Sequence, residues 1–293
     1  MRVGIVILPE DRWWAAEPKW RAAEEYGFAH AWTYDHLGWR DLVDGPWFSA
    51  VPTLTAAAMV TSRIRLGTFV ANPNFRHPVP FARELLTLDD VSDGRFMLGV
   101  GAGGAGYDTT VLGAQPLTPS ARTARFGEFV ELLDRLLIQE RTTFEGEWFS
   151  AQEARSAPGC VQRPRMPFLV AANGPKAMDV AARWGSGWVT TGPATEDDET
   201  WWAGVAKTVD VFHEVLDRRG RSPRSIDHYL NLDSSPVYSL TSAERFRDAA
   251  CRARELGFTD VISHWPRSHG VYGGREVVLE QVAAEVLPDL ASA

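Results

Sequence analysis

Short apolar runs alternate with amphipathic helical stretches along all 293 residues, and this alternation constrains the fold more than any other feature. We expect eight buried strands, at residues 2–8, 30–34, 64–70, 96–100, 168–172, 187–191, 226–232 and 260–263. Parallel strands need crossover connections, which helices supply, so the pattern predicts a parallel sheet. The even strand count, the length, and the lack of Gly-x-Gly-x-x-Gly after the first strand favour a closed (β/α)8 TIM barrel over an open doubly wound sheet.

Helices are expected between these strands, and two insertion segments interrupt the regular pattern. The helices fall at about 18–26, 52–61, 80–91, 120–139, 175–184, 199–219, 242–256 and 275–287. The insertions are a hairpin over residues 142–149 and an irregular, proline-containing excursion over residues 154–167. Since no stretch resembles a linker, we expect one domain over residues 1–293.

Charge and composition narrow the class of protein. The formal net charge is -8, which argues against a binder of nucleic acid or of anionic membranes. The first apolar run is too short for a signal peptide, and no apolar stretch reaches the roughly 20 residues of a membrane span. The two cysteines, Cys160 and Cys251, form no paired motif and are interpreted as reduced thiols. We therefore expect a cytoplasmic protein.

Polar residues follow the second strand, where the open face of a barrel collects its functional groups. Asp35 and His36 stand together there, and an imidazole near neutral pH can carry acid–base chemistry. The alternative is a loop aspartate that caps backbone beside a rim histidine. The spacing alone does not separate these two interpretations.

Three later strand ends carry further signals. The third strand runs into Asn72 and Pro73, which implies a sharp redirection or merely a rigid loop. The fourth runs into a glycine-rich segment, residues 99–106, whose backbone can approach a flat ligand or an anion, or can be simply flexible. The fifth runs into Asn173, Gly174 and Pro175, a helix start that either binds phosphate or only caps the helix.

The eighth strand is followed by His264 and Trp265, which we expect to face a substrate together with Trp39 and Trp47. These aromatic residues suggest a partly apolar substrate. The first strand contains no histidine, whereas a metal-dependent hydrolase barrel usually carries His-x-His there. We therefore expect no metal.

Taken in order, these segments resemble the luciferase-like oxidoreductases. The resemblance rests on Tyr34-Asp35-His36, on Leu66-Gly67-Thr68 leading to Arg76-His77-Pro78, on residues 93–103 and on residues 171–175. It extends over roughly residues 1 to 290. Each motif is weak by itself, but the ordered set is specific.

The resemblance implies a flavin-type ring across the open face of the barrel and assigns a role to each strand end. It implies a non-proline cis peptide between Phe69 and Val70, behind the ring. Asp35 and His36 would lie beside the ring, with His36 as the candidate for proton transfer. The residues implied to hold the cofactor are Asp35, His36, Thr68, Phe69, Val70, Asn72, Gly101, Ala102, Gly103, Gly104, Ala172, Asn173, Gly174 and Pro175.

The resemblance leaves two cofactors open, coenzyme F420 (a deazaflavin) and FMN. The sequence Gly-Val-Gly-Ala-Gly at residues 99–103 and the pair Asp35-His36 resemble the F420-dependent branch of this family. FMN monooxygenases often carry an arginine in the loop after the fourth strand. In this sequence no arginine follows the fourth strand before Arg122. In F420-dependent sugar-phosphate dehydrogenases a glutamate follows the glycines, and Gly104 stands at that position here. A sugar dehydrogenase is therefore not favoured.

We expect hydride transfer with F420 on a small organic substrate. The alternatives are an FMN-dependent monooxygenase with a partner reductase, and a barrel that binds flavin without turnover. A flavin or F420 reductase is an expected partner of the chain. The resemblance also implies a homodimer.

Overall fold

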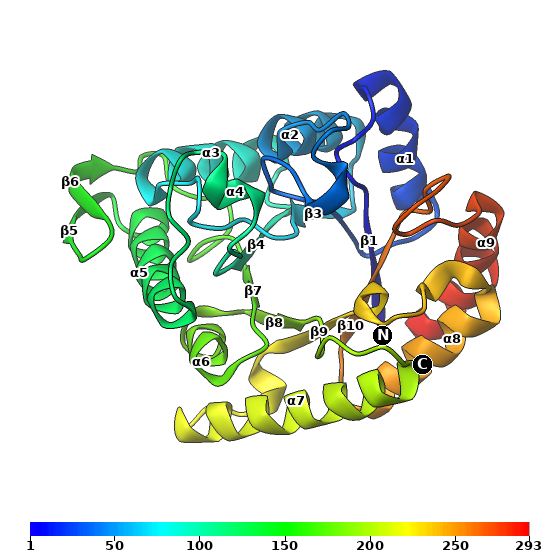
Figure 1. The fold of residues 1–293 in the computed structure, drawn as a ribbon. Coiled ribbons are helices and arrows are strands. Elements are labelled where there is room, and N and C mark those ends of the chain that lie inside the picture. The colour runs from blue at the N-terminus through cyan, green and yellow to red at the C-terminus, as the bar shows by residue number, and fades with distance from the viewer. Residues whose placement is uncertain (293) are drawn as a thin grey trace.

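The computed structural model describes residues 1–292 and shows a closed barrel of eight parallel strands (Figure 1). The strand order around the barrel is β1-β10-β9-β8-β7-β4-β3-β2, as the alternation predicts. The barrel strands are β1 (Arg2–Val6), β2 (His30–Thr33), β3 (Arg65–Thr68), β4 (Phe96–Gly101), β7 (Phe168–Ala171), β8 (Gly187–Thr190), β9 (Asp227–Asn231) and β10 (Asp260–His264). The last strand closes the ring against the first, with Val6 paired to His264.

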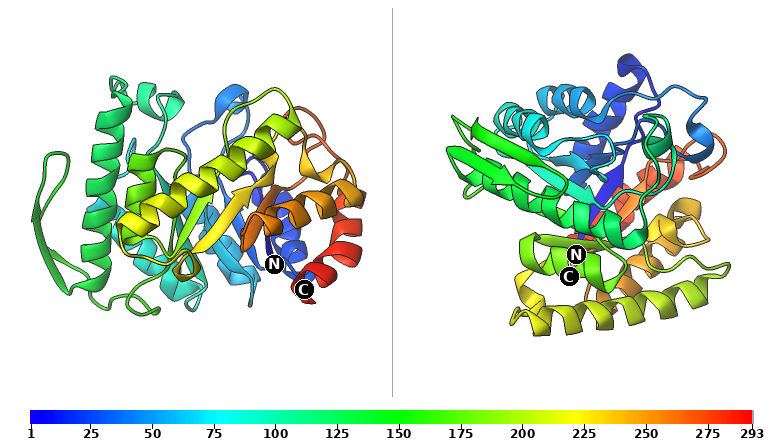
Figure 2. Two further views of the ribbon diagram at one scale, coloured as in Figure 1. Left: turned by 90° about the horizontal axis from the view of Figure 1, so that it is seen from below. Right: turned by 60° about the vertical axis from the view of Figure 1, so that its left-hand side comes forward.

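Helices surround the barrel and cover its outer face (Figures 1 and 2). They are α1 (Trp13–Glu25), α2 (Ala50–Val60), α3 (Pro78–Val91), α4 (Tyr107–Thr110), α5 (Pro119–Ile138), α6 (Pro175–Trp184), α7 (Asp198–Arg218), α8 (Ala243–Glu255), α9 (Glu276–Gln281) and α10 (Leu287–Ser292). A π-helical turn, Val282–Val286, joins the last two. No helix within residues 1–292 combines the length and the apolar character that crossing a bilayer requires.

Two expectations about the helices need correction. The first helix begins at Trp13 and contains Pro18 in its interior, whereas we placed its start at this proline. The closing helix continues beyond residue 287, because the π-helical turn carries the chain into α10. The predicted hairpin is confirmed as β5 (Arg141–Glu145) and β6 (Ser150–Arg155), an antiparallel pair outside the barrel that projects near α5 in Figure 2.

The barrel interior is a packed core rather than a channel. Inward-facing side chains such as Trp32, Met97, Tyr229 and Ile262 form one apolar cluster, separate from the larger cluster under the helices. Gly67 makes room for this packing, since a Cβ there would lie 2.4 Å from the Trp32 ring. Because the interior is filled, a ligand can enter only at the ends of the strands.

Candidate active site

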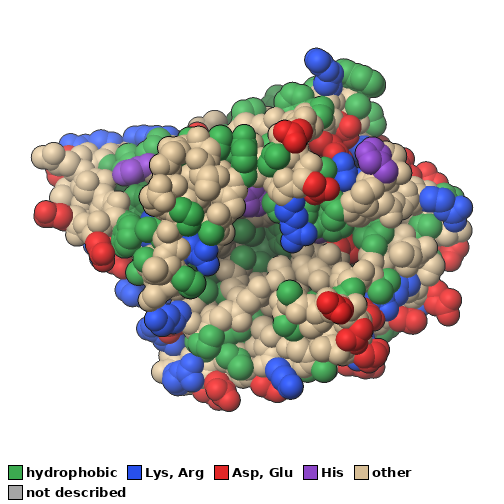
Figure 3. Space-filling view, viewed as in Figure 1, with side chains coloured by type: hydrophobic (Ala, Val, Ile, Leu, Met, Phe, Trp, Pro, Cys, Tyr) green, Lys and Arg blue, Asp and Glu red, His purple; other side chains and the backbone are tan. Residues whose placement is uncertain are grey.

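Two adjoining cavities open at the carboxyl ends of the strands, the face where loops of a barrel converge. The first, about 280 Å³, reaches from Tyr34 and Phe69 across to Asn173 and Tyr272. The second, about 630 Å³, lies along Asn74 and residues 104–108. His36, Trp39 and Arg40 belong to both. Figure 3 shows the hollow at this end of the molecule, with Lys and Arg side chains at its rim.

The histidine between the two cavities has a carboxylate partner. Nδ1 of His36 lies 2.6 Å from Oδ2 of Asp108, and the other oxygen of Asp108 accepts the backbone N–H of Leu37 at 2.7 Å. Asp108 is buried on the short helix α4, while the His36 side chain is 23% exposed. When Nδ1–H donates to this carboxylate, Nε2 is free to accept or return a proton on the cavity side.

Asp35, which we expected beside a cofactor ring, points away from both cavities. Its carboxylate is buried and accepts two hydrogen bonds from Arg76, at 2.6 and 2.7 Å. Burial by itself would lower the pKa of Arg76, but the hydrogen bonds and charge of Asp35, with Glu84 beyond, raise it. Successive residues of an extended segment face opposite sides, so Tyr34 and His36 face the cavity and Asp35 cannot. Asp35 thus joins the loop after β2 to the loop after β3.

The floor of the first cavity comes from the third strand. The peptide bond between Phe69 and Val70 is cis, which confirms the expectation from the resemblance, and both residues line the cavity. Thr68, directly before them, is fully buried and donates to the carbonyl of Gly99 at 2.7 Å. Asn72 is buried behind the wall, where its side chain accepts the backbone N–H of Asn74 at 3.0 Å. Phe69 and Val70 can therefore contact a ligand directly, whereas Thr68 and Asn72 support them.

The glycine run forms the boundary of the second cavity. Gly103 has a left-handed φ of 72°, and a Cβ on it would lie 2.7 Å from the Asn74 side chain. Asn74 in turn donates to the carbonyl of Gly104 at 2.9 Å. Of the predicted residues 101–104, Gly104 lines the cavity, Gly101 ends strand β4, and Ala102 and Gly103 connect the strand to that wall.

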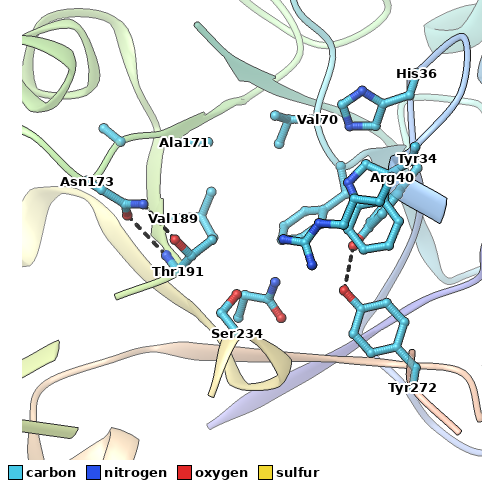
Figure 4. A pocket seen from close by; sticks show the side chains of 14 residues that line it. Tyr34, His36, Arg40, Val70, Ala171, Asn173, Val189, Thr191, Ser234 and Tyr272 are labelled. Carbon is cyan, nitrogen blue, oxygen red and sulfur yellow. Dashed lines mark hydrogen bonds between the residues drawn. The ribbon is translucent and has the colours of Figure 1, made fainter. Parts of the chain in front are cut away.

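Asn173 lies on the opposite wall. Its Oδ1 accepts from the Thr190 hydroxyl at 2.7 Å and from the Thr191 amide at 3.1 Å, while its Nδ2 donates to the Thr191 hydroxyl at 2.6 Å. These bonds fix the end of β7 to the end of β8, and Figure 4 shows those between Asn173 and Thr191. Asn173 does not cap α6, because Gly174 occupies that position with Pro175 following it. Ala172 and Asn173 line the first cavity.

The four predicted substrate residues divide between the cavity and its support. Trp39 lines both cavities. Trp47 lies behind Tyr34 and donates to the carbonyl of His36 at 2.8 Å. His264 is fully buried, and Trp265 turns outward to pack on Tyr26. The expectation that His264 and Trp265 face a substrate is therefore wrong, since both side chains are enclosed by neighbouring protein.

A cluster of positive charge beside the second cavity was missed by the sequence analysis. Arg122 and Arg125 lie on α5, and Arg125 hydrogen-bonds the Asn74 side chain on the cavity wall. Burial, and then the charge of Arg122, lower the pKa of Arg125. Within the described part of the chain, both arginines have a buried Nε atom without a hydrogen-bond partner and make no ion pair with a carboxylate. We call Arg122 and Arg125 the arginine pair.

The barrel with this cavity arrangement belongs to the class of (β/α)8 proteins that bind a ligand across the strand ends. Residues 2–277 match the family model described as luciferase-like monooxygenase, and the chain belongs to that family.

Individual relatives extend this result. The F420-dependent glucose-6-phosphate dehydrogenase of Kineococcus radiotolerans is 36% identical over 228 residues, which cover 74% of this chain and 64% of the relative, so the match spans less than two thirds of that protein. An uncharacterised protein of Mycobacterium bovis is 30% identical over 287 residues, covering 91% of this chain and 92% of the relative. Among solved structures, an F420-dependent secondary alcohol dehydrogenase superposes with a TM-score of 0.82 at 20% identity and covers 99% of this chain and 98% of its own.

Proposed function

We propose that this protein is an oxidoreductase that uses coenzyme F420 to move a hydride to or from a small organic substrate. The observation that carries the proposal is the His36–Asp108 pair, placed where the two cavities meet. A histidine held by a carboxylate at 2.6 Å and open to a cavity is a group suited to proton transfer. The F420-dependent relatives support the choice of cofactor.

The residues present fit a cofactor with a flat ring and an anionic tail. The first cavity offers an apolar surface from Phe69, Val70 and Val189, against which an aromatic ring can pack. The arginine pair offers buried N–H donors that lack partners, and such donors are costly unless an acceptor satisfies them. Phosphate and carboxylate oxygens are the acceptors that arginine prefers.

Each part of the site then has a defined task. When bound, the deazaflavin supplies the hydride chemistry. Phe69 and Val70 support the ring, the arginine pair holds the tail, and Asn173 keeps the far wall in place through Thr190 and Thr191. His36 holds a proton or a free lone pair at Nε2, according to the direction of the reaction.

The FMN-dependent monooxygenase stays the second candidate, because the matching family model is described as luciferase-like monooxygenase. Titration of the purified protein with oxidised F420 and, separately, with FMN tests the choice. We expect saturable binding of F420, followed by fluorescence, and weaker binding of FMN. Tight FMN binding without F420 binding would establish the monooxygenase alternative instead.

A non-catalytic flavin carrier is the remaining alternative, and His36 separates it from an enzyme. For an enzyme, His36→Ala removes turnover and leaves F420 bound. For a carrier, neither the wild type nor His36→Ala turns over substrate.

A further inference from the structure

A second set of ionisable side chains lies beneath the first cavity and is not used by the proposed function. Asp233 follows strand β9, His264 is the last residue of strand β10, and both side chains are fully buried behind the cavity wall. Tyr34 and Tyr272 lie above them and form part of the cavity wall. The four residues are far apart in the sequence and meet only because parallel strands end at the same face.

Three hydrogen bonds connect the four side chains in a single line. Oδ2 of Asp233 lies 2.9 Å from Nδ1 of His264, and Nε2 of His264 lies 2.8 Å from the Tyr34 hydroxyl. The Tyr34 hydroxyl lies 2.9 Å from the Tyr272 hydroxyl. The line therefore runs from a buried carboxylate to a phenol at the cavity wall, and Figure 4 shows its last bond.

The direction of donation along this line follows from counting hydrogens. An ionised Asp233 only accepts, so Nδ1 of His264 carries a hydrogen, and in a neutral ring Nε2 carries none. Tyr34 must then donate to Nε2, and Tyr272 must donate to Tyr34. Burial raises the pKa of Tyr34 well above its ordinary value and raises the pKa of Tyr272 to about 12, so both phenols keep the hydrogens that this order requires.

Two further features hold the line in place. Tyr272 has a left-handed φ of 58°, a conformation that costs a non-glycine residue free energy and is commonly retained at functional sites. This backbone lays the Tyr272 ring on the His264 ring, with centroids 3.7 Å apart and planes at 12°. Asp233 also accepts the backbone N–H of His264 at 2.6 Å, which fixes the imidazole relative to the carboxylate.

We propose that Tyr272, Tyr34, His264 and Asp233 form a proton relay that accepts the hydroxyl proton of an alcohol substrate. This inference rests on the proposed function, in which oxidised F420 accepts the hydride, and it names the substrate class as alcohols and the corresponding carbonyl compounds. Figure 4 shows His36 and Tyr272 on opposite sides of Tyr34, so the relay is separate from the His36–Asp108 pair.

With this relay, the hydride and the proton that an alcohol loses on oxidation both have an acceptor. The carbinol C–H bond breaks, and its hydride passes to the oxidised deazaflavin. The substrate O–H proton passes to the Tyr272 oxygen, the Tyr272 proton to Tyr34, and the Tyr34 proton to Nε2 of His264. The carbonyl forms, and the imidazolium is stabilised by the Asp233 carboxylate. In the reverse direction the same bonds deliver a proton to the oxygen of a carbonyl substrate.

The first experiment measures where the hydrogens are and needs no substrate. The seven histidines are labelled with ¹⁵N, and the His264 signals are assigned by their loss in His264→Gln. We expect His264 to carry its hydrogen on Nδ1, with an Nε2 signal that shifts in Tyr34→Phe. Tyr238→Phe is the matched control, because its hydroxyl donates to the backbone carbonyl of His264 at 2.6 Å and lies outside the relay. A neutral His264 protonated on Nε2 would refute the relay.

The second experiment measures turnover with propan-2-ol, butan-2-ol and cyclohexanol as probes and oxidised F420 as acceptor. We expect kcat to fall about 100-fold or more in Tyr272→Phe and in Tyr34→Phe, with F420 binding retained and Tyr238→Phe like wild type. If the protein binds F420 but none of these alcohols reduces it, the substrate class is wrong while the proposed cofactor stands. If F420 does not bind, the proposed function itself is wrong.

Discussion

Nδ1 of His36 and Oδ2 of Asp108 lie 2.6 Å apart although 72 residues separate them in the chain. This contact fixes which imidazole nitrogen faces the cavity. Asp108 also accepts the Leu37 amide, so a single carboxylate positions both the histidine and the loop that follows it. The pair depends on the four-residue helix α4, which begins directly after the glycine run.

We predict that Asp108→Asn lowers kcat by about 100-fold to 10,000-fold and leaves F420 binding intact. An amide donates as well as accepts, so it no longer enforces the tautomer with a free Nε2. Steady-state kinetics and an F420 titration check this expectation. Asp44→Asn, an exposed aspartate in the loop after His36, serves as the control. Wild-type kcat in Asp108→Asn would mean that the carboxylate has no part in turnover.

The buried pair of Asp35 and Arg76 leads to a prediction about stability rather than chemistry. We predict that Arg76→Met lowers the free energy of unfolding by about 3–5 kcal/mol, because it leaves the Asp35 carboxylate buried without a cation. Glu84→Gln removes the more exposed partner of Arg76 and is expected to cost about 1 kcal/mol or less. Denaturant unfolding followed by circular dichroism measures both values.

A double variant distinguishes an uncompensated charge from lost packing. In Asp35→Asn with Arg76→Met the buried charge is gone, so we expect part of the lost stability to return. If Arg76→Met is as stable as wild type, Asp35 does not depend on this ion pair.

The arginine pair gives a prediction about the cofactor. We predict that Arg122→Gln and Arg125→Gln each weaken F420 binding about 10-fold or more, because a hydrogen bond to a charged group contributes about 1.5–3 kcal/mol. The same deazaflavin ring without its anionic tail should bind the variants and wild type equally. Arg218→Gln, on the exposed side of α7, is the control. If the variants lose the same affinity for F420 and for the ring without its tail, the arginine pair contacts the ring instead of the tail.

The sequence predicted the barrel and the strand-end residues because both follow from local rules. Short apolar strands and amphipathic helical stretches are encoded by near neighbours in the chain, and parallel strands of a barrel end at the same face. That is why His36, Phe69, Val70 and Asn173 come together around one cavity.

The partners of these residues could not be predicted in the same way. Asp108 meets His36, and Asp233 meets His264, only after distant loops pack against one another. The placement of Asp35 was available in principle, since the alternation of an extended segment puts it on the side opposite Tyr34 and His36. A short polar stretch such as α4, by contrast, has no apolar periodicity that could reveal a helix.

The last prediction concerns His228, which packs on the outer wall of the barrel and is 3% exposed. Its ring lies among Trp188, Phe212 and Phe258, and both of its nitrogens lack hydrogen-bond partners within the described residues. Burial, and then the charge of the nearby His213, lower the pKa of His228 to about 4. Above about pH 4 the folded protein therefore holds this histidine in its neutral form.

The sign of the pH effect follows from comparing the two states. In the unfolded chain a histidine titrates near pH 6.5, so between about pH 6.5 and 4 the unfolded state binds a proton that the folded state does not. The free energy of unfolding then falls as the pH falls through this window, by up to about 3 kcal/mol from this residue. Above pH 6.5 the contribution is fully present.

His228→Phe removes the titrating group and keeps an aromatic ring among its aromatic neighbours. We expect its free energy of unfolding to depend less on pH between 6.5 and 4 than that of wild type, as measured by urea unfolding at a series of pH values. Protonation of the carboxylates changes the stability of both proteins alike. The difference between the two curves is therefore the contribution of His228. His269→Phe, at an exposed position, should follow wild type. Parallel curves for His228→Phe and wild type would show that His228 is protonated equally in the folded and unfolded chain.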